Sequence, residues 1–176
     1  MKHLRKFENY NVESDNSKFR HLNFEIPDGE YNFEVNISEL IGKVVIDVKY
    51  DSKSLTLVCS DKENSEIYYT FYHEQDCCES VWLEDIIGDL SDLIPNPILK
   101  AEVKENVDFE LPKTYDEYDS PKTYDEYDSS TNWTFYTLAT FYGYVDLRFF
   151  GTSNGYYSTA VSIMRTIPFE ENKIYS

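Results

Sequence analysis

The sequence has 176 residues, of which 41% are hydrophobic and 16% aromatic. This composition excludes a wholly disordered chain and fits one compact domain. Sixteen Lys and Arg stand against 33 Asp and Glu, which gives a net charge of −17 and argues against direct binding to nucleic acid or to anionic membranes. The chain has no apolar run of about 18 residues, no signal-peptide pattern and three cysteines, so we expect a soluble protein of a reducing cytoplasm.

The first periodic segment spans residues 22–37, where apolar residues alternate on both sides of Pro27-Asp28-Gly29-Glu30. Alternation at every second residue predicts β-strands, and the Pro-Asp-Gly sequence is typical of a turn. We therefore predict an N-terminal hairpin extension within residues 1–40. A single β-rich domain is predicted at 41–167, followed by a tail at 168–176.

The next segments change from strand periodicity to helix periodicity. Apolar residues occupy every second position in three segments that are separated by short polar breaks, at residues 44–50, 55–59 and 67–71. This pattern predicts three antiparallel strands. From Trp82 to Ile94 the apolar residues recur at spacings of three and four, which predicts short helical turns.

The C-terminal part is again strand-like, at residues 133–141, 144–150 and 156–166. Asn154-Gly155 predicts a hairpin between the last two strands, because both residue types tolerate positive φ. We interpret the many aromatic residues here as core and cross-strand packing; they are Trp133, Phe135, Tyr136, Phe141, Tyr142, Tyr144, Phe149, Phe150, Tyr156 and Tyr157. The expected fold class is α+β, mostly antiparallel β-sheet with a few short helices.

An acidic insert at about 105–130 interrupts the predicted domain and contains a perfect duplication. The sequence PKTYDEYDS at residues 112–120 is repeated without change at residues 121–129. The unit is too short and too polar to build a solenoid, so a flexible surface loop is the first interpretation. The alternative interpretation keeps four tyrosines as aromatic anchors for a partner, namely Tyr115, Tyr118, Tyr124 and Tyr127.

The negative charge is concentrated in two segments of the chain. Residues 63–99 hold nine acidic residues and no Lys or Arg, and residues 105–130 carry a net charge of −7. A single acidic loop is usually a solvated surface, but two such segments favour a surface that meets a basic partner. The candidate partner-binding residues outside the insert are Glu79, Trp82, Glu84, Asp85, Asp89 and Asp92.

One cluster has the character of a metal site. His73, Cys77 and Cys78 offer an imidazole and two thiols within six residues, a donor set that suits Zn²⁺, and Asp76 or Glu79 would supply a fourth ligand. The spacing of these residues supports an alternative equally well, in which His73 is hydrogen-bonded and one cysteine is buried as a small apolar residue. Cys59 continues the alternation of its strand and is assigned to the core.

The run from His73 to Ser80, followed by Leu83-Glu-Asp-Ile86, resembles a domain of unknown function found widely in phage and prophage proteins. Trp133-Thr-Phe-Tyr136 and Ser153-Asn-Gly-Tyr-Tyr-Ser158 match the second half of that domain, so the resemblance covers roughly residues 41–167. Small acidic phage proteins of this kind are similar to anti-CRISPR proteins, including metal-containing inhibitors of type II-A Cas9.

The resemblance implies a phage-encoded inhibitor that binds Cas9 through an acidic surface and blocks loading of target DNA in the host cytoplasm. It also favours zinc at His73, Cys77 and Cys78 over the alternative. No catalytic motif supplies a reaction, so we predict a protein that is not an enzyme. Two other functions stay open: a metal-dependent phage enzyme acting on nucleotides or signalling molecules, and a phage structural protein.

Overall fold

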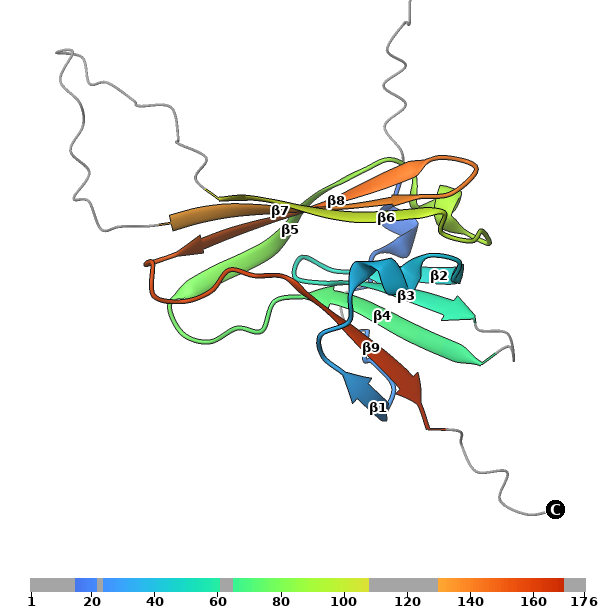
Figure 1. Ribbon diagram of the computed structural model, residues 1–176, viewed down its shortest axis with the longest axis horizontal. Coiled ribbons are helices and arrows are strands. Elements are labelled where there is room, and N and C mark those ends of the chain that lie inside the picture. The colour runs from blue at the N-terminus through green and yellow to red at the C-terminus, as the bar shows by residue number, and fades with distance from the viewer. Residues whose placement is uncertain (1–14, 22–23, 61–64, 108–129, 170–176) are drawn as a thin grey trace, which may run out of the picture.

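A computed structural model describes residues 15–21, 24–60, 65–107 and 130–169. The described chain is mainly β: nine strands form two antiparallel sheets (Figure 1). Helical structure among the described residues is limited to three 3₁₀ helices, η1 (Ser17–Phe19), η2 (Ile37–Leu40) and η3 (Leu90–Leu93). The expectation of mostly antiparallel sheet is confirmed, whereas the α part of the expected α+β class is reduced to these short turns.

The two sheets have five and four strands. Sheet A has the order β1 (Gly29–Asn32), β9 (Ser162–Pro168), β4 (Glu66–Tyr72), β3 (Leu55–Ser60), β2 (Val44–Tyr50). Sheet B has the order β5 (Glu79–Ile87), β8 (Tyr144–Ser153), β7 (Ser130–Ala139), β6 (Lys100–Val107). The three predicted strands at 44–50, 55–59 and 67–71 are confirmed as β2, β3 and β4, with the predicted antiparallel pairing.

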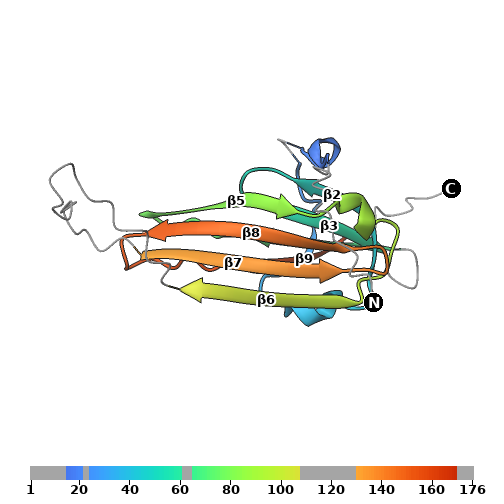
Figure 2. The same cartoon turned by 90° about the horizontal axis from the view of Figure 1, so that it is seen from above.

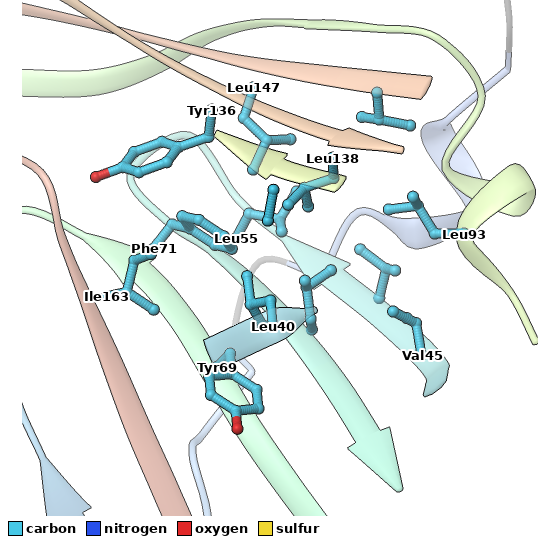
Figure 3. Close-up of a cluster of buried hydrophobic side chains, with 14 of the residues drawn as sticks. Leu40, Val45, Leu55, Tyr69, Phe71, Leu93, Tyr136, Leu138, Leu147 and Ile163 are labelled. Carbon is cyan, nitrogen blue, oxygen red and sulfur yellow. The ribbon is translucent and has the colours of Figure 1, made fainter. Parts of the chain in front are cut away.

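The sheets lie as two layers with the hydrophobic core between them (Figures 1 and 3). Strand alternation explains this core, because every second residue of a strand points to the same face. Leu55, Leu57 and Cys59 are fully buried on β3, and Leu147 is fully buried on β8. Cys59 is thus a core residue as predicted, and burial raises the pKa of its thiol to about 12.

The helical turns predicted from Trp82 are wrong up to Ile87, because this segment is strand β5. A β-bulge at Glu84 explains the error: the pairing of β5 with β8 shifts by one residue between Leu83 and Asp85. Leu83 packs into the core before the bulge and Ile86 packs against it after the bulge. The spacing of three across the bulge therefore imitates a helix. Only η3 at the end of the segment is helical.

Two predicted hairpins are also wrong. β1 pairs with β9 at the other end of the described chain, and residues 24–28 form no strand against it. The Asn154-Gly155 turn does contain a positive φ, at Gly155, but it connects β8 in sheet B to β9 in sheet A. Local turn sequences identified the bends of the chain, whereas pairing with distant strands decided the topology.

Two further predictions concern the acidic insert and the absence of a membrane-spanning segment. β6 ends at Val107 and β7 begins at Ser130, so most of the predicted insert lies outside the described residues, with Tyr115, Tyr118, Tyr124 and Tyr127. Within the described part of the chain, no helix has the length and apolar character needed to span a membrane.

Candidate protein-binding surface

Four aromatic rings form a continuous cluster on the outer face of sheet B, the face that points away from the core. The ring centroids of Trp82 and Phe150 are 5.1 Å apart, those of Phe150 and Trp133 are 4.7 Å apart, and those of Trp133 and Phe135 are 5.8 Å apart. Each side chain is only partly buried. Figure 2 shows the strands of sheet B from this side, in front of the strands of sheet A, and the hydrophobic core lies between the two sheets.

Alternation along the strands places this aromatic cluster (Trp82, Trp133, Phe135 and Phe150) outward. On β7, Tyr136 and Leu138 are buried in the core, so Phe135 between the inward positions points to the other face. Trp133, Phe135 and Phe150 were predicted to serve core and cross-strand packing, whereas Trp82 was predicted as a partner-binding residue. The cross-strand packing is confirmed, because Phe150 is paired with both Trp82 and Trp133. The core packing is wrong for these residues, because they lie on the outer face of sheet B and are only partly buried.

Carboxylates border the aromatic cluster. The Trp82 indole N–H donates to Glu84, and the carboxylate of Asp85 lies 3.9 Å from the Arg148 guanidinium. Glu84 and Asp85 are both exposed because the bulge turns two successive residues away from the core. The result is an apolar centre with a charged rim, which is the usual composition of a protein interface.

The loop between β7 and β8 presents two further exposed rings. Phe141 is 87% exposed and Tyr142 is 71% exposed. The loop is nonetheless held in place: the Thr140 hydroxyl donates to the Asp92 carbonyl over 2.7 Å, and the Thr140 N–H donates to the Gly143 carbonyl over 2.9 Å. Gly143 packs so closely on the Asp92 side chain that a Cβ would collide with it. These contacts hold the backbone of this hairpin tip (residues 140–143), which presents both rings to solvent.

The predicted acidic residues Asp89 and Asp92 lie at the same end of sheet B. Asp89 caps η3, because its carboxylate accepts the Ser91 N–H over 2.8 Å. Hydrogen bonds from the Ser91 hydroxyl and amide lower the pKa of Asp89. Asp92 contacts the hairpin tip. We call the aromatic cluster, the hairpin tip and the carboxylates of Glu84, Asp85 and Asp92 the acidic-aromatic surface.

Glu79 does not belong to this surface, which corrects the sequence prediction. Its side chain is fully buried, and its carboxylate accepts hydrogen bonds from the backbone N–H groups of Asp76 and Cys77. The Asp76 hydrogen bond is the main cause of the lowered pKa of Glu79, with smaller contributions from Cys77 and His73 against the opposing effect of desolvation. Glu79 organises the loop after β4 and is not available to a partner.

The three predicted zinc ligands do not converge. His73 Nδ1 lies 2.8 Å from the Ala160 carbonyl and Nε2 lies 3.4 Å from Glu79, so both ring nitrogens face protein oxygens. Cys77 and Cys78 are exposed free thiols with their sulfurs 2.8 Å apart. Within the described ranges no three His, Cys, Asp or Glu side chains are grouped to hold a metal. The hydrogen-bonded His73 of the alternative is observed, but neither cysteine is buried.

Comparison with known proteins identifies the family of the chain. The family model described as Domain of unknown function (DUF7448) matches residues 38–163, and the chain therefore belongs to this family. No curated protein and no solved structure matches the chain. The matched region contains the acidic-aromatic surface and the loop around Glu79.

Part of the acidic-aromatic surface was predictable from the sequence, and part of it was not. Trp82, Glu84 and Asp85 were predicted as partner-binding residues, and the structure places them next to one another. Trp133, Phe135 and Phe150 were missed, together with Phe141 and Tyr142 at the hairpin tip. Alternation on β7 was the available signal, but aromatic residues occupy both faces of that strand, so their identity alone did not reveal which face is outward.

Proposed function

We propose that this protein is a non-enzymatic binding module that docks through its acidic-aromatic surface on a basic protein partner. The contiguous aromatic cluster on the outer face of sheet B carries this proposal. A sheet face that leaves two Trp and two Phe side chains partly exposed gains free energy when a partner covers them.

The chemistry of the acidic-aromatic surface favours a partner rich in Lys and Arg. Aromatic faces attract cations, and Trp is the strongest of them. The neighbouring carboxylates of Glu84 and Asp85 add charge complementarity, which speeds association with a basic surface. The net charge of −17 acts in the same direction over a longer range.

We propose a Cas9-type effector as the partner, in the cytoplasm of a bacterium that hosts the phage encoding this protein. Such effectors hold the guide and target heteroduplex in a positively charged channel. An acidic protein bound at or beside this channel would block loading of target DNA without any chemical reaction. This partner rests on the resemblance to anti-CRISPR proteins given above, and the acidic-aromatic surface supports it through its charge.

The test is co-purification of the full chain with a type II-A Cas9 and its guide, followed by a target-DNA binding assay. Replacing both Phe141 and Tyr142 by Ala should weaken the complex by about tenfold or more, because truncating interface anchors typically costs about 2 kcal/mol. The matched control is Phe33→Ala, a ring that is 57% exposed outside this surface. Trp82→Ala tests the aromatic cluster in the same way. Equal inhibition by both the double variant and Trp82→Ala, or no complex with the parent protein, contradicts the proposal.

A structural zinc is a separate part of the proposal. As they stand, His73, Cys77 and Cys78 do not form a site, and zinc binding would require the His73 imidazole to leave Glu79. Elemental analysis of protein prepared without chelator should find about one zinc per chain if the prediction holds. In that case His73→Ala should remove the metal and lower the melting temperature, because binding to the native site stabilises the fold. Metal-free protein would refute it.

A further inference from the structure

A second surface feature lies at the edge of the sandwich, away from the acidic-aromatic surface. Two hollows of about 400 and 510 Å³ adjoin one another here and share Glu34 and Ser162 in their linings. The first lies between the segment before η2 and the inner side of β6. We call the two hollows together the edge trough.

The floor of the first hollow is apolar, whereas the second hollow is lined mainly by polar side chains. Val35, Ile37 and Val103 line the first hollow together with Tyr136 of β7. Val103 is paired with Tyr136 across the sheet and shares its inward orientation, yet Val103 is 43% exposed. It is exposed because β6 is an edge strand and the opposite layer leaves it partly uncovered.

The rim of the edge trough is acidic. Glu34 and Glu105 border the first hollow, and Glu34, Glu74 and Asp76 border the second. Neither lining contains a Lys or Arg among the described residues. A hollow with an apolar floor, bordered by carboxylates and by no Lys or Arg, disfavours phosphates, acidic peptides and fatty acids, because each would bring negative charge to these carboxylates.

The strand that borders the edge trough is also open to pairing. Among the described strands, β6 pairs with β7 alone, so its other edge has no strand partner. An unpaired strand edge accepts an extended peptide through backbone hydrogen bonds, and neighbouring pockets then select its side chains.

We infer that the edge trough binds an extended peptide segment of a partner that carries both apolar and Lys or Arg side chains. The apolar side chains cover Val35, Ile37 and Val103, and the cationic side chains approach Glu34 and Glu105. This inference goes beyond the proposed function, because it concerns a different surface and does not require the partner to be Cas9.

The experiment measures the affinity of the full chain for a short fluorescein-labelled peptide of alternating leucine and lysine by fluorescence anisotropy. A serine-lysine peptide of equal charge tests whether the apolar floor contributes. The test variant carries Glu34→Gln and Glu105→Gln, and the matched control carries Glu25→Gln and Glu30→Gln, which removes the same charge from exposed positions outside the trough and away from β6. Val103→Trp fills the apolar floor without altering the charge.

We expect the leucine-lysine peptide to bind at least about fivefold more tightly than the serine-lysine peptide. The test variant and Val103→Trp should each weaken binding by about fivefold, and the control pair by less than about twofold. Equal affinity for the two peptides, or equal weakening by the test and control pairs, would overturn the inference, since the attraction would then be general to an acidic protein. The Phe141 and Tyr142 variant should bind the peptide normally, which separates this result from that of the proposed function.

Discussion

At the scale of single residues, Glu79 shows how a carboxylate in an acidic segment can be structural. Its side chain is fully buried where the loop after β4 turns into β5, and it accepts backbone hydrogen bonds from Asp76 and Cys77. These bonds favour the charged form and keep the pKa of Glu79 below its ordinary value. The carboxylate therefore stabilises the fold only while it is ionised.

Replacing Glu79 by Gln should lower the melting temperature at neutral pH and make it less sensitive to acid. Because the folded-state pKa is lowered, the stabilisation by Glu79 is present above the unfolded-state pKa and is lost as the pH falls through the folded-state value. The difference between the parent and Glu79→Gln should therefore be largest near pH 7 and shrink on acidification, in thermal melts followed by circular dichroism. Glu74→Gln, an exposed neighbour, should leave the melting temperature nearly unchanged; an equal effect of the two variants would show that burial of Glu79 is unimportant.

Glu79 also shows which part of the candidate site could not be predicted from the sequence. Residue type and local charge were enough to select Trp82, Glu84 and Asp85, which are exposed on or beside one face of sheet B. They were not enough for Glu79, because its role depends on hydrogen bonds to the backbone of its own loop. A list of acidic residues in a sequence contains no information on which backbone N–H groups they will meet.

At the scale of secondary structure, the bulge at Glu84 determines what β5 presents to each side. It lets Leu83 and Ile86 both pack toward the core although they are three residues apart. It also exposes Glu84 and Asp85 together beside Trp82. A regular strand would turn one of the later apolar residues outward, since a shift of one residue exchanges the two faces.

Deleting Glu84 should therefore be far more damaging than substituting it. The deletion either exposes Ile86 or forces β5 to slip against β8, and we expect a loss of about 2 kcal/mol or more in the free energy of unfolding. Glu84→Ala keeps the extra residue and removes a surface side chain, so its cost should be below about 1 kcal/mol. Urea unfolding of both variants measures the difference, and similar losses would mean that the bulge does not set the register.

Periodicity predicted the individual strands better than their partners. β2, β3 and β4 follow one another along the chain, so alternation and polar breaks were sufficient to predict their pairing. β1 and β9 pair across most of the described chain, and no local signal encodes that contact. The aromatic cluster was missed for a related reason, since an outward face is defined only when the second sheet covers the opposite one.

At the scale of the whole molecule, the duplicated segment lies in the connection from β6 to β7, and β6 is paired with β7 along all of its own length. Deleting residues 121–129 should leave the melting temperature nearly unchanged. Closing a flexible loop costs only about 0.6 kcal/mol more for each doubling of its length, so shortening it changes stability little. A large loss of stability in calorimetry would show that the duplicated segment packs on the domain. A normal melting temperature with weaker partner binding would instead assign its tyrosines to the interface.

The negative charge of the molecule should affect the rate at which it associates with a basic partner. Reversing Glu84, Asp85 and Asp92 to Lys while keeping Asp89, which caps η3, should slow association with a basic partner by about tenfold at low salt. Added salt should slow the parent protein toward the rate of the variant, because screening acts on the same attraction. Reversal of Glu25, Asp28 and Glu30, three exposed acids at the N-terminal side of sheet A, makes the same change in net charge and separates the effect of position from that of total charge. Stopped-flow measurements across a salt series compare the three proteins. Slower association of the Glu84, Asp85 and Asp92 variant alone assigns the contact to the acidic-aromatic surface. If both triple variants associate equally slowly, the attraction is general to the acidic molecule. If neither variant associates more slowly than the parent, the acidic-aromatic surface does not meet the partner.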